Sequence, residues 1–114
     1  MFFSSVYYAK LSLKKGLKMI VHIVMFKFRE ENKTQNIQQV EKELNALVEK
    51  IDELKSIEVG VDFNGSERAF DLSLYSTFES KDALACYAIH PEHLKVVALI
   101  KEVTSGAKVV DYEK

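Results

Sequence analysis

Hydrophobic residues recur with two different periods along this chain, and the change of period separates predicted strands from predicted helices. Residues 20–28 (IVHIVMFKF) are rich in β-branched and aromatic side chains, which is typical of a strand. Both faces of this strand are mostly apolar, so we expect both to be covered. Two helices on a small domain cover only one side of its sheet. The second side is therefore expected to meet another subunit.

The next apolar residues follow the period of a helix. Asn32 and Gln35 have the spacing of a capping box at its start, although Thr34 is a rival cap. Apolar residues then recur at steps of three and four, which predicts one stripe on a helix of about five turns. The stripe consists of Ile37, Val40, Leu44, Leu47, Val48, Ile51 and Leu54.

Two strands are predicted after this helix. Residues 57–63 alternate between apolar and polar side chains, and residues 70–78 have one apolar and one more polar face. The Asn-Gly-Ser segment at residues 64–66 supplies a turn between them. The two strands should therefore form an antiparallel hairpin.

The C-terminal third of the chain predicts a helix that the single proline interrupts. Ser80 can cap a short helix that ends near His90, because the residue before a proline avoids the helical region. Pro91 suits the first turn of a second helix, which Gly106 would close. A last strand is expected at residues 108–112 (KVVDY).

The resulting order is β-α-β-β-α-β, which is the order of the ferredoxin-like α+β fold with an antiparallel sheet. Helices on one face of four strands leave the other face open. Two such faces packed together would make a homodimer with a barrel-like interior, a dimeric α+β barrel. We therefore expect the chain to pair with a second copy through its open sheet face.

Composition restricts the possible classes of protein. The 114 residues suffice for one compact domain. Sixteen basic and 17 acidic residues give a net charge of -1, which argues against nucleic-acid and anionic-membrane partners. No apolar run reaches the roughly 18 residues of a membrane-spanning helix. The single cysteine, Cys86, excludes an internal disulfide, favours a reducing, cytoplasmic location and is expected to be a buried, unreactive thiol.

Residues 1–18 (MFFSSVYYAKLSLKKGLK) have no clear period and are interpreted as an N-terminal extension of a domain at 19–114. Their basic residues come last, which is the wrong order for a signal peptide. Three interpretations stay open. Met19 is the natural start, or the segment is a disordered arm, or it is an extension that binds a partner.

Residues 87–93 (YAIHPEH) concentrate side chains that could carry acid–base chemistry. Histidine exchanges protons near neutral pH, so His93 could remove a proton next to a carbonyl group. Tyr87 could donate a hydrogen bond to the oxygen on which charge develops. His22 projects from the strand face that should meet the helices, so it could line the same cavity.

Each of these residues also has a structural interpretation. Tyr87 and His93 can be packing anchors around the helix break, and His22 can be a core histidine. His90 can cap the helix that begins at Pro91. A metal site needs three or four converging ligands, and the helix start separates His90 from His93, so no metal is expected. The sequence has no glycine-rich phosphate loop and no haem or flavin motif, so no other cofactor is expected either.

The chain from residue 19 to residue 112 resembles the stress-responsive A/B-barrel (Dabb) family of the dimeric α+β-barrel superfamily. The match rests on HIVMFKF at 22–28, on FDL at 70–72 followed by TFES at 77–80, on YAIHPEH at 87–93 and on VDY at 110–112. Most members of this family look like small uncharacterised proteins, and some are linked to stress.

The resemblance also implies a candidate site. One branch of the family includes a plant polyketide cyclase that closes a ring without a cofactor, and its catalytic tyrosine and histidine match Tyr87 and His93. Its first-strand histidine matches His22. Its third-strand histidine is replaced by Leu72, and its first-helix tyrosine falls near residues 44 and 45, where this chain has no tyrosine. The matching pair is therefore present in a pocket that differs.

Three functions remain open from the sequence. The leading one is binding or stress-related handling of a small, partly apolar molecule in a pocket that His22, Leu72 and His90 help to line. The second is a cofactor-free lyase, cyclase or isomerase with His93 as base and Tyr87 as hydrogen-bond donor. The third is a structural module whose sheet face drives oligomerisation.

Overall fold

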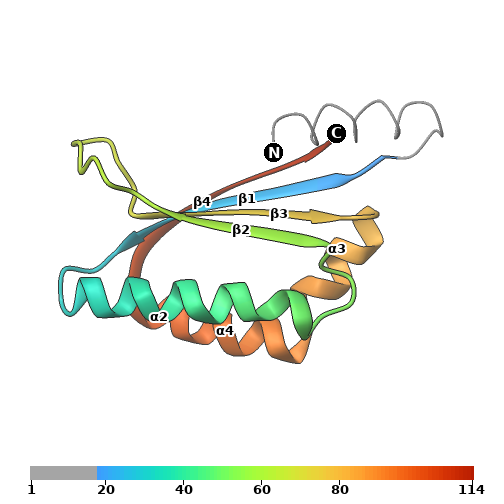
Figure 1. Ribbon diagram of the computed structural model, residues 1–114, viewed down its shortest axis with the longest axis horizontal. Helices are drawn as coiled ribbons and strands as arrows, with labels where there is room; N and C mark the ends of the chain where they lie inside the picture. Colours follow the sequence, from blue (N-terminus) through green and yellow to red (C-terminus); the bar gives the residue numbers. More distant parts are fainter. Residues whose placement is uncertain (1–17) are drawn as a thin grey trace.

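A four-stranded antiparallel sheet, with helices covering one of its faces, forms the ferredoxin-like fold of the chain in its computed structural model (Figure 1). The structure describes residues 18–114, so all but the last residue of the predicted N-terminal extension lies outside the described residues. The strand order is β2-β3-β1-β4. The elements are β1 (Ile20–Phe28), α2 (Lys33–Ala46), β2 (Ser56–Val61), β3 (Leu72–Phe78), α3 (Lys81–Ala88), α4 (Pro91–Val103) and β4 (Thr104–Glu113), with a 3₁₀ turn at Leu47–Glu49.

Strand β1 lies in the middle of the sheet and determines which side chains face the helices. It pairs with β3 on one side and with the edge strand β4 on the other, both antiparallel. His22 is opposite Ser76 of β3 and Asp111 of β4. Because side chains alternate along a strand, His22, Val24 and Phe26 share the face that α2 and α4 cover (Figure 1).

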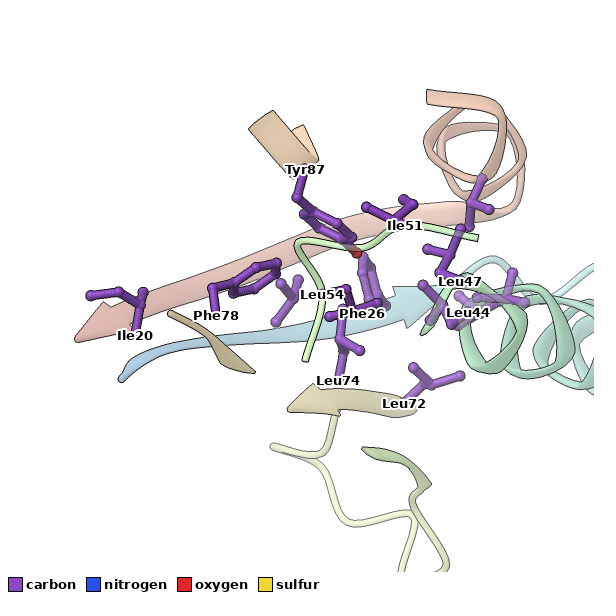
Figure 2. Close-up of a cluster of buried hydrophobic side chains, with 14 residues drawn as sticks. Ile20, Phe26, Leu44, Leu47, Ile51, Leu54, Leu72, Leu74, Phe78 and Tyr87 are labelled. Atoms are coloured by element: carbon purple, nitrogen blue, oxygen red, sulfur yellow. The ribbon is translucent and has the colours of Figure 1, made fainter. Parts of the chain in front are cut away.

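The hydrophobic core lies between the sheet and the helices, and Figure 2 shows side chains from both layers meeting there. Phe78 of β3 is 0% exposed, and Leu44 of α2 is 2% exposed. Burial of one such side chain contributes about 1.5–3 kcal/mol relative to leaving it exposed. This packing holds the helices over β1 and so fixes the position of every group that reaches the space between them.

Helix α2 is shorter than the apolar pattern predicts. It ends at Ala46, so the prediction of about five turns is wrong, although Ile51 and Leu54 are still buried at 1% and 3% exposure. The apolar spacing continues because the chain still crosses the core after it leaves the helix. Asn32 occupies the N-cap position as predicted, but it has a left-handed conformation (φ 51°) and makes no side-chain cap bond, so the capping box does not form. The rival cap, Thr34, lies inside the helix.

The hairpin of β2 and β3 is antiparallel as predicted, but both strands are shorter at the connecting end. Phe63 lies beyond β2 and is 99% exposed. Asp71 precedes β3, and its carboxylate contacts residues at the end of β1 and the start of α2. Its Oδ2 accepts a hydrogen bond from the Phe28 amide (2.7 Å), and its Oδ1 lies 3.1 Å from Lys33 Nζ. The Asp71 amide also donates to the Phe26 carbonyl (2.8 Å). This residue therefore joins the end of β1, the start of α2 and the β2–β3 connection.

Both predicted caps in the C-terminal third form, and the helix break at Pro91 is confirmed. The Ala83 amide donates to Ser80 Oγ (3.0 Å), and the Glu92 amide donates to His90 Nδ1 (3.1 Å). The prediction that Gly106 closes α4 is wrong. Helix α4 ends at Val103 and passes directly into β4, so Gly106 lies within the strand.

Within residues 18–114 no single helix is both long enough and apolar enough to cross a membrane. Helices α3 and α4 meet the requirement only when taken together, by length and composition alone, and the two are bent by 64° at their junction.

Candidate functional site

A cavity of about 460 Å³ lies between α4 and the β1–β4 side of the sheet. Its walls come from both the sheet and the helices, and they are mainly apolar. Its polar lining comes from His22, His93, Lys101, Thr104 and Ser105, while Val24, Phe26, Leu44, Leu74, Val96, Val97 and Ile100 supply most of the apolar surface.

His93 stands in the first turn of α4, on the side that faces the cavity. Its Nδ1 lies 3.0 Å from the Ala88 carbonyl oxygen, which can only accept, so Nδ1 carries the proton and donates it. Burial lowers the pKa of His93 by more than the Ala88 carbonyl raises it, and His22 and His90 add smaller lowering effects. The ring is therefore neutral at neutral pH and leaves Nε2 as an unprotonated acceptor, which is the form that a general base needs.

His22 reaches the same cavity from β1 and has a carboxylate partner. Its Nδ1 lies 2.5 Å from Oδ1 of Asp111, the residue opposite it on β4. This contact fixes the orientation of the imidazole and leaves Nε2 as the nitrogen that is not engaged by the sheet. The antiparallel register of β1 and β4 thus creates a carboxylate–histidine pair beside the cavity.

Tyr87 lies behind His93 rather than on the cavity wall. Its ring packs between Phe78 and His93, with ring centroids 4.9 Å and 4.2 Å apart. The side chain enters the core from α3 (Figure 2), is 1% exposed, and its hydroxyl has no hydrogen-bond partner within residues 18–114. Burial raises the pKa of Tyr87 to about 12, so the phenol stays protonated.

The structure brings His22 and His93 to one cavity and leaves two other expected pocket residues elsewhere. His90 is engaged as the cap of α4 and is not part of the cavity lining. Leu72 is packed in the core at 2% exposure and instead borders a hollow beneath the β2–β3 connection. Cys86 is exposed on α3, so the expectation of a buried thiol is wrong.

The sequence interpretation did not identify Asp111 and Lys101 as site residues. A signal for Asp111 existed, because antiparallel pairing of the first and last predicted strands can place an acidic residue opposite His22. Lys101 can be identified as a lining residue only from the packing of α4 against the sheet. No cluster of three or more histidine, cysteine, aspartate or glutamate side chains that could hold a metal occurs in the described part of the chain.

The known sequences that resemble this chain share one domain. The family model of the stress responsive A/B barrel domain (Dabb) matches residues 20–114. The stress-response A/B barrel domain-containing protein At5g22580 of Arabidopsis thaliana is 31% identical over 94 residues, which cover 80% of this chain and 82% of that protein. A longer protein of the same plant, also named for this domain, is 37% identical over 81 residues, which cover 70% of this chain but only 30% of that protein.

Solved structures share the fold. A dimeric protein of unknown function and ferredoxin-like fold from Bacteroides fragilis is 35% identical, with a TM-score of 0.78 over 84% of this chain and 96% of that one. The hydroxynitrile lyase from Passiflora edulis is 21% identical, with a TM-score of 0.76 over 84% of this chain and 93% of the lyase, a likeness in fold. The family match extends over most of the chain and agrees with the topology, so the protein belongs to the stress-responsive A/B-barrel (Dabb) domain family.

Proposed function

We propose that this protein binds a small, partly apolar molecule in the cavity between α4 and the sheet. The observation that carries the proposal is the cavity itself. Its volume of about 460 Å³ is within the range of small-molecule sites, and apolar walls surround a few convergent polar groups, as such sites require. His22 and His93 supply two of those groups, and the free Nε2 of His93 can accept a hydrogen bond from a hydroxyl of the ligand.

A second candidate is a cofactor-free lyase, cyclase or isomerase that uses His93 as its base. The contact of His93 Nδ1 with the Ala88 carbonyl favours it, because the remaining Nε2 is the basic atom on a cavity-lining ring. A protein of the same fold is a hydroxynitrile lyase. Tyr87 would support this base by packing against its ring, because its hydroxyl is buried and the residue does not line the cavity. An enzyme of this kind would lose turnover in His93→Gln.

The proposal includes a homodimer formed through the open face of the sheet. On that face, Met25 and Val110 are 42% and 57% exposed, and Tyr112 is 43% exposed. Exposed apolar patches of this kind mark interaction surfaces. The Bacteroides fragilis protein of the same fold is described as dimeric. The ligand cavity and the dimer face would then lie on opposite sides of β1.

The binding function is tested by filling the cavity. Val97 lines it, whereas the neighbouring Ala98 is exposed and does not. We expect Val97→Phe to weaken binding of the neutral fluorescent probe N-phenyl-1-naphthylamine by about tenfold, or about 1.4 kcal/mol. Ala98→Phe, which adds a ring to the same helix outside the cavity, should bind the probe like the wild type. Equal probe affinity in the wild type and a folded Val97→Phe variant would contradict the proposal.

A further inference from the structure

We propose that the ligand of this cavity is an anionic amphiphile, with its acidic group beside Lys101 and its apolar body extending toward His22 and His93. This inference deepens the proposed binding function and rests on it. The expected ligand is an organic acid with an extended hydrocarbon body.

The cavity has two chemically different ends. His93, Val97 and Lys101 recur every four residues on α4, so they lie on one side of the helix, and His93 and Lys101 are about 12 Å apart along its axis. On β1, His22 and Phe26 lie on the same face about 13 Å apart. Both histidines line one end and Lys101 the other, because α4 runs in the same direction as β1.

The strand register supports this common direction. Phe28, at the end of β1, pairs with Thr104, the residue that directly follows α4. The last turn of α4 is therefore beside the end of β1, and its first turn is toward the beginning of that strand. His22 also contributes to the lowered pKa of His93, which agrees with their location at one end.

The charges of the site select an orientation for an anion. Among the described residues that line the cavity, Lys101 is the one lysine or arginine, and none is aspartate or glutamate. At the histidine end, the Asp111 carboxylate is already paired with His22 at 2.5 Å, and the described lining residues of this end include no lysine or arginine. An acidic group is therefore favoured at the Lys101 end.

The ammonium group of Lys101 forms no ion pair within residues 18–114. Lys95 on the same helix pairs with Glu92 at 3.1 Å, whereas Lys101 makes no ion pair with a described residue. Two of the last carbonyl groups of α4, which a lysine in this turn can neutralise, are already bonded. Thr104 Oγ1 donates to the Ile100 carbonyl (2.8 Å), and the Arg29 amide donates to the Val103 carbonyl (2.9 Å).

The inference is tested with two probes that share an alkyl chain and differ in charge. Decanoate and decan-1-ol compete with N-phenyl-1-naphthylamine near neutral pH, and both have an extended chain that suits the cavity. The wild type should bind decanoate more tightly than decan-1-ol. Lys101→Gln should weaken decanoate about fivefold, the range of a partly exposed ion pair, and leave decan-1-ol unchanged. Lys95→Gln, from the same helix but outside the cavity, should change neither.

The outcomes separate this inference from the binding function. Equal affinity of the wild type for the two probes, or equal decanoate affinity in wild type and Lys101→Gln, overturns the anionic class while binding of the neutral probes keeps the proposed function. An equal loss of decanoate binding in Lys95→Gln would mean a general surface-charge effect and would also overturn it. If neither alkyl probe binds the wild type, the inference falls, and a failure of N-phenyl-1-naphthylamine to bind removes the proposed function with it.

Discussion

The two histidines of the cavity are fixed by different kinds of partner. His93 donates to a backbone carbonyl at the junction of α3 and α4, and His22 contacts a carboxylate on the neighbouring strand β4. In both rings Nδ1 is the engaged atom, so Nε2 is the atom that a ligand can meet. Burial lowers the pKa of His93 against the opposing effect of the Ala88 carbonyl, which keeps this ring in the basic form.

The buried hydroxyl of Tyr87 leads to a prediction about stability. A buried donor that lacks a partner costs about 1–3 kcal/mol, so removing it should not destabilise the fold. We expect Tyr87→Phe to have a free energy of unfolding equal to that of the wild type or higher by about 1 kcal/mol, measured by urea denaturation. Tyr87→Leu, which removes the ring packed on Phe78 and His93, should lose at least about 1 kcal/mol. A destabilised Tyr87→Phe would mean that the hydroxyl has a partner.

At the scale of elements, Asp71 connects three segments that are distant in the sequence. Its carboxylate accepts from the Phe28 amide, and its contact with Lys33 raises the pKa of that lysine. We expect Asp71→Ala to lower the free energy of unfolding by about 1–3 kcal/mol, because the Phe28 amide loses its acceptor. Asp71→Asn keeps an acceptor and should lose less. Asp62→Ala, which removes an exposed carboxylate that accepts from the Gly65 amide, should cost under about 1 kcal/mol in the same urea measurement.

The sequence predicts which elements exist better than where they end. Period and caps identify all four strands and the helix break at Pro91, since these signals are local. Ile51 follows the helical period although α2 has already ended, because burial in the core, rather than helix, maintains that spacing. Gly106 is a helix-closing residue by type, yet Thr104 closes α4 by bonding the Ile100 carbonyl.

The same limit applies to the site. His22 is predictable as a cavity residue because it lies on the strand face that meets the helices, and His93 because of its residue type and its position in the 87–93 segment. Asp111 depends on the register between the first and last strands, and Lys101 on how α4 is rotated against the sheet. Neither quantity is a property of a local sequence window.

At the scale of the whole molecule, the two faces of the sheet have different roles: one lines the cavity and the other is the proposed dimer interface. Adjacent residues of β4 face opposite sides: Val109 pairs with Val24 on the helix side, and Val110 pairs with Ile23 on the open side. Among residues 18–114, the helices cover only the first of these sides (Figure 1). The proposed dimer therefore uses the side chains of β1 and β4 that the cavity does not.

This alternation provides a matched test of the dimer. Val109 and Val110 are both 57% exposed, so a charge at either position is equally tolerable in the monomer. We expect Val110→Glu to weaken dimerisation by at least about tenfold, because a carboxylate would be desolvated in the interface. Val109→Glu should remain dimeric at the same concentration in sedimentation-velocity experiments. A wild-type monomer, or equal dissociation of both variants, would contradict an interface on the open face.

The exposed thiol on α3 gives this protein a built-in point of attachment for spectroscopy. Cys86 is the single cysteine of the sequence, so a maleimide dye will label one defined position without any engineering. It immediately precedes Tyr87, whose ring packs on His93 at the cavity wall. A fluorophore there would be attached one residue from the aromatic stack but outside the cavity lining, so it can be tested as an optical reporter of cavity occupancy that leaves the site free.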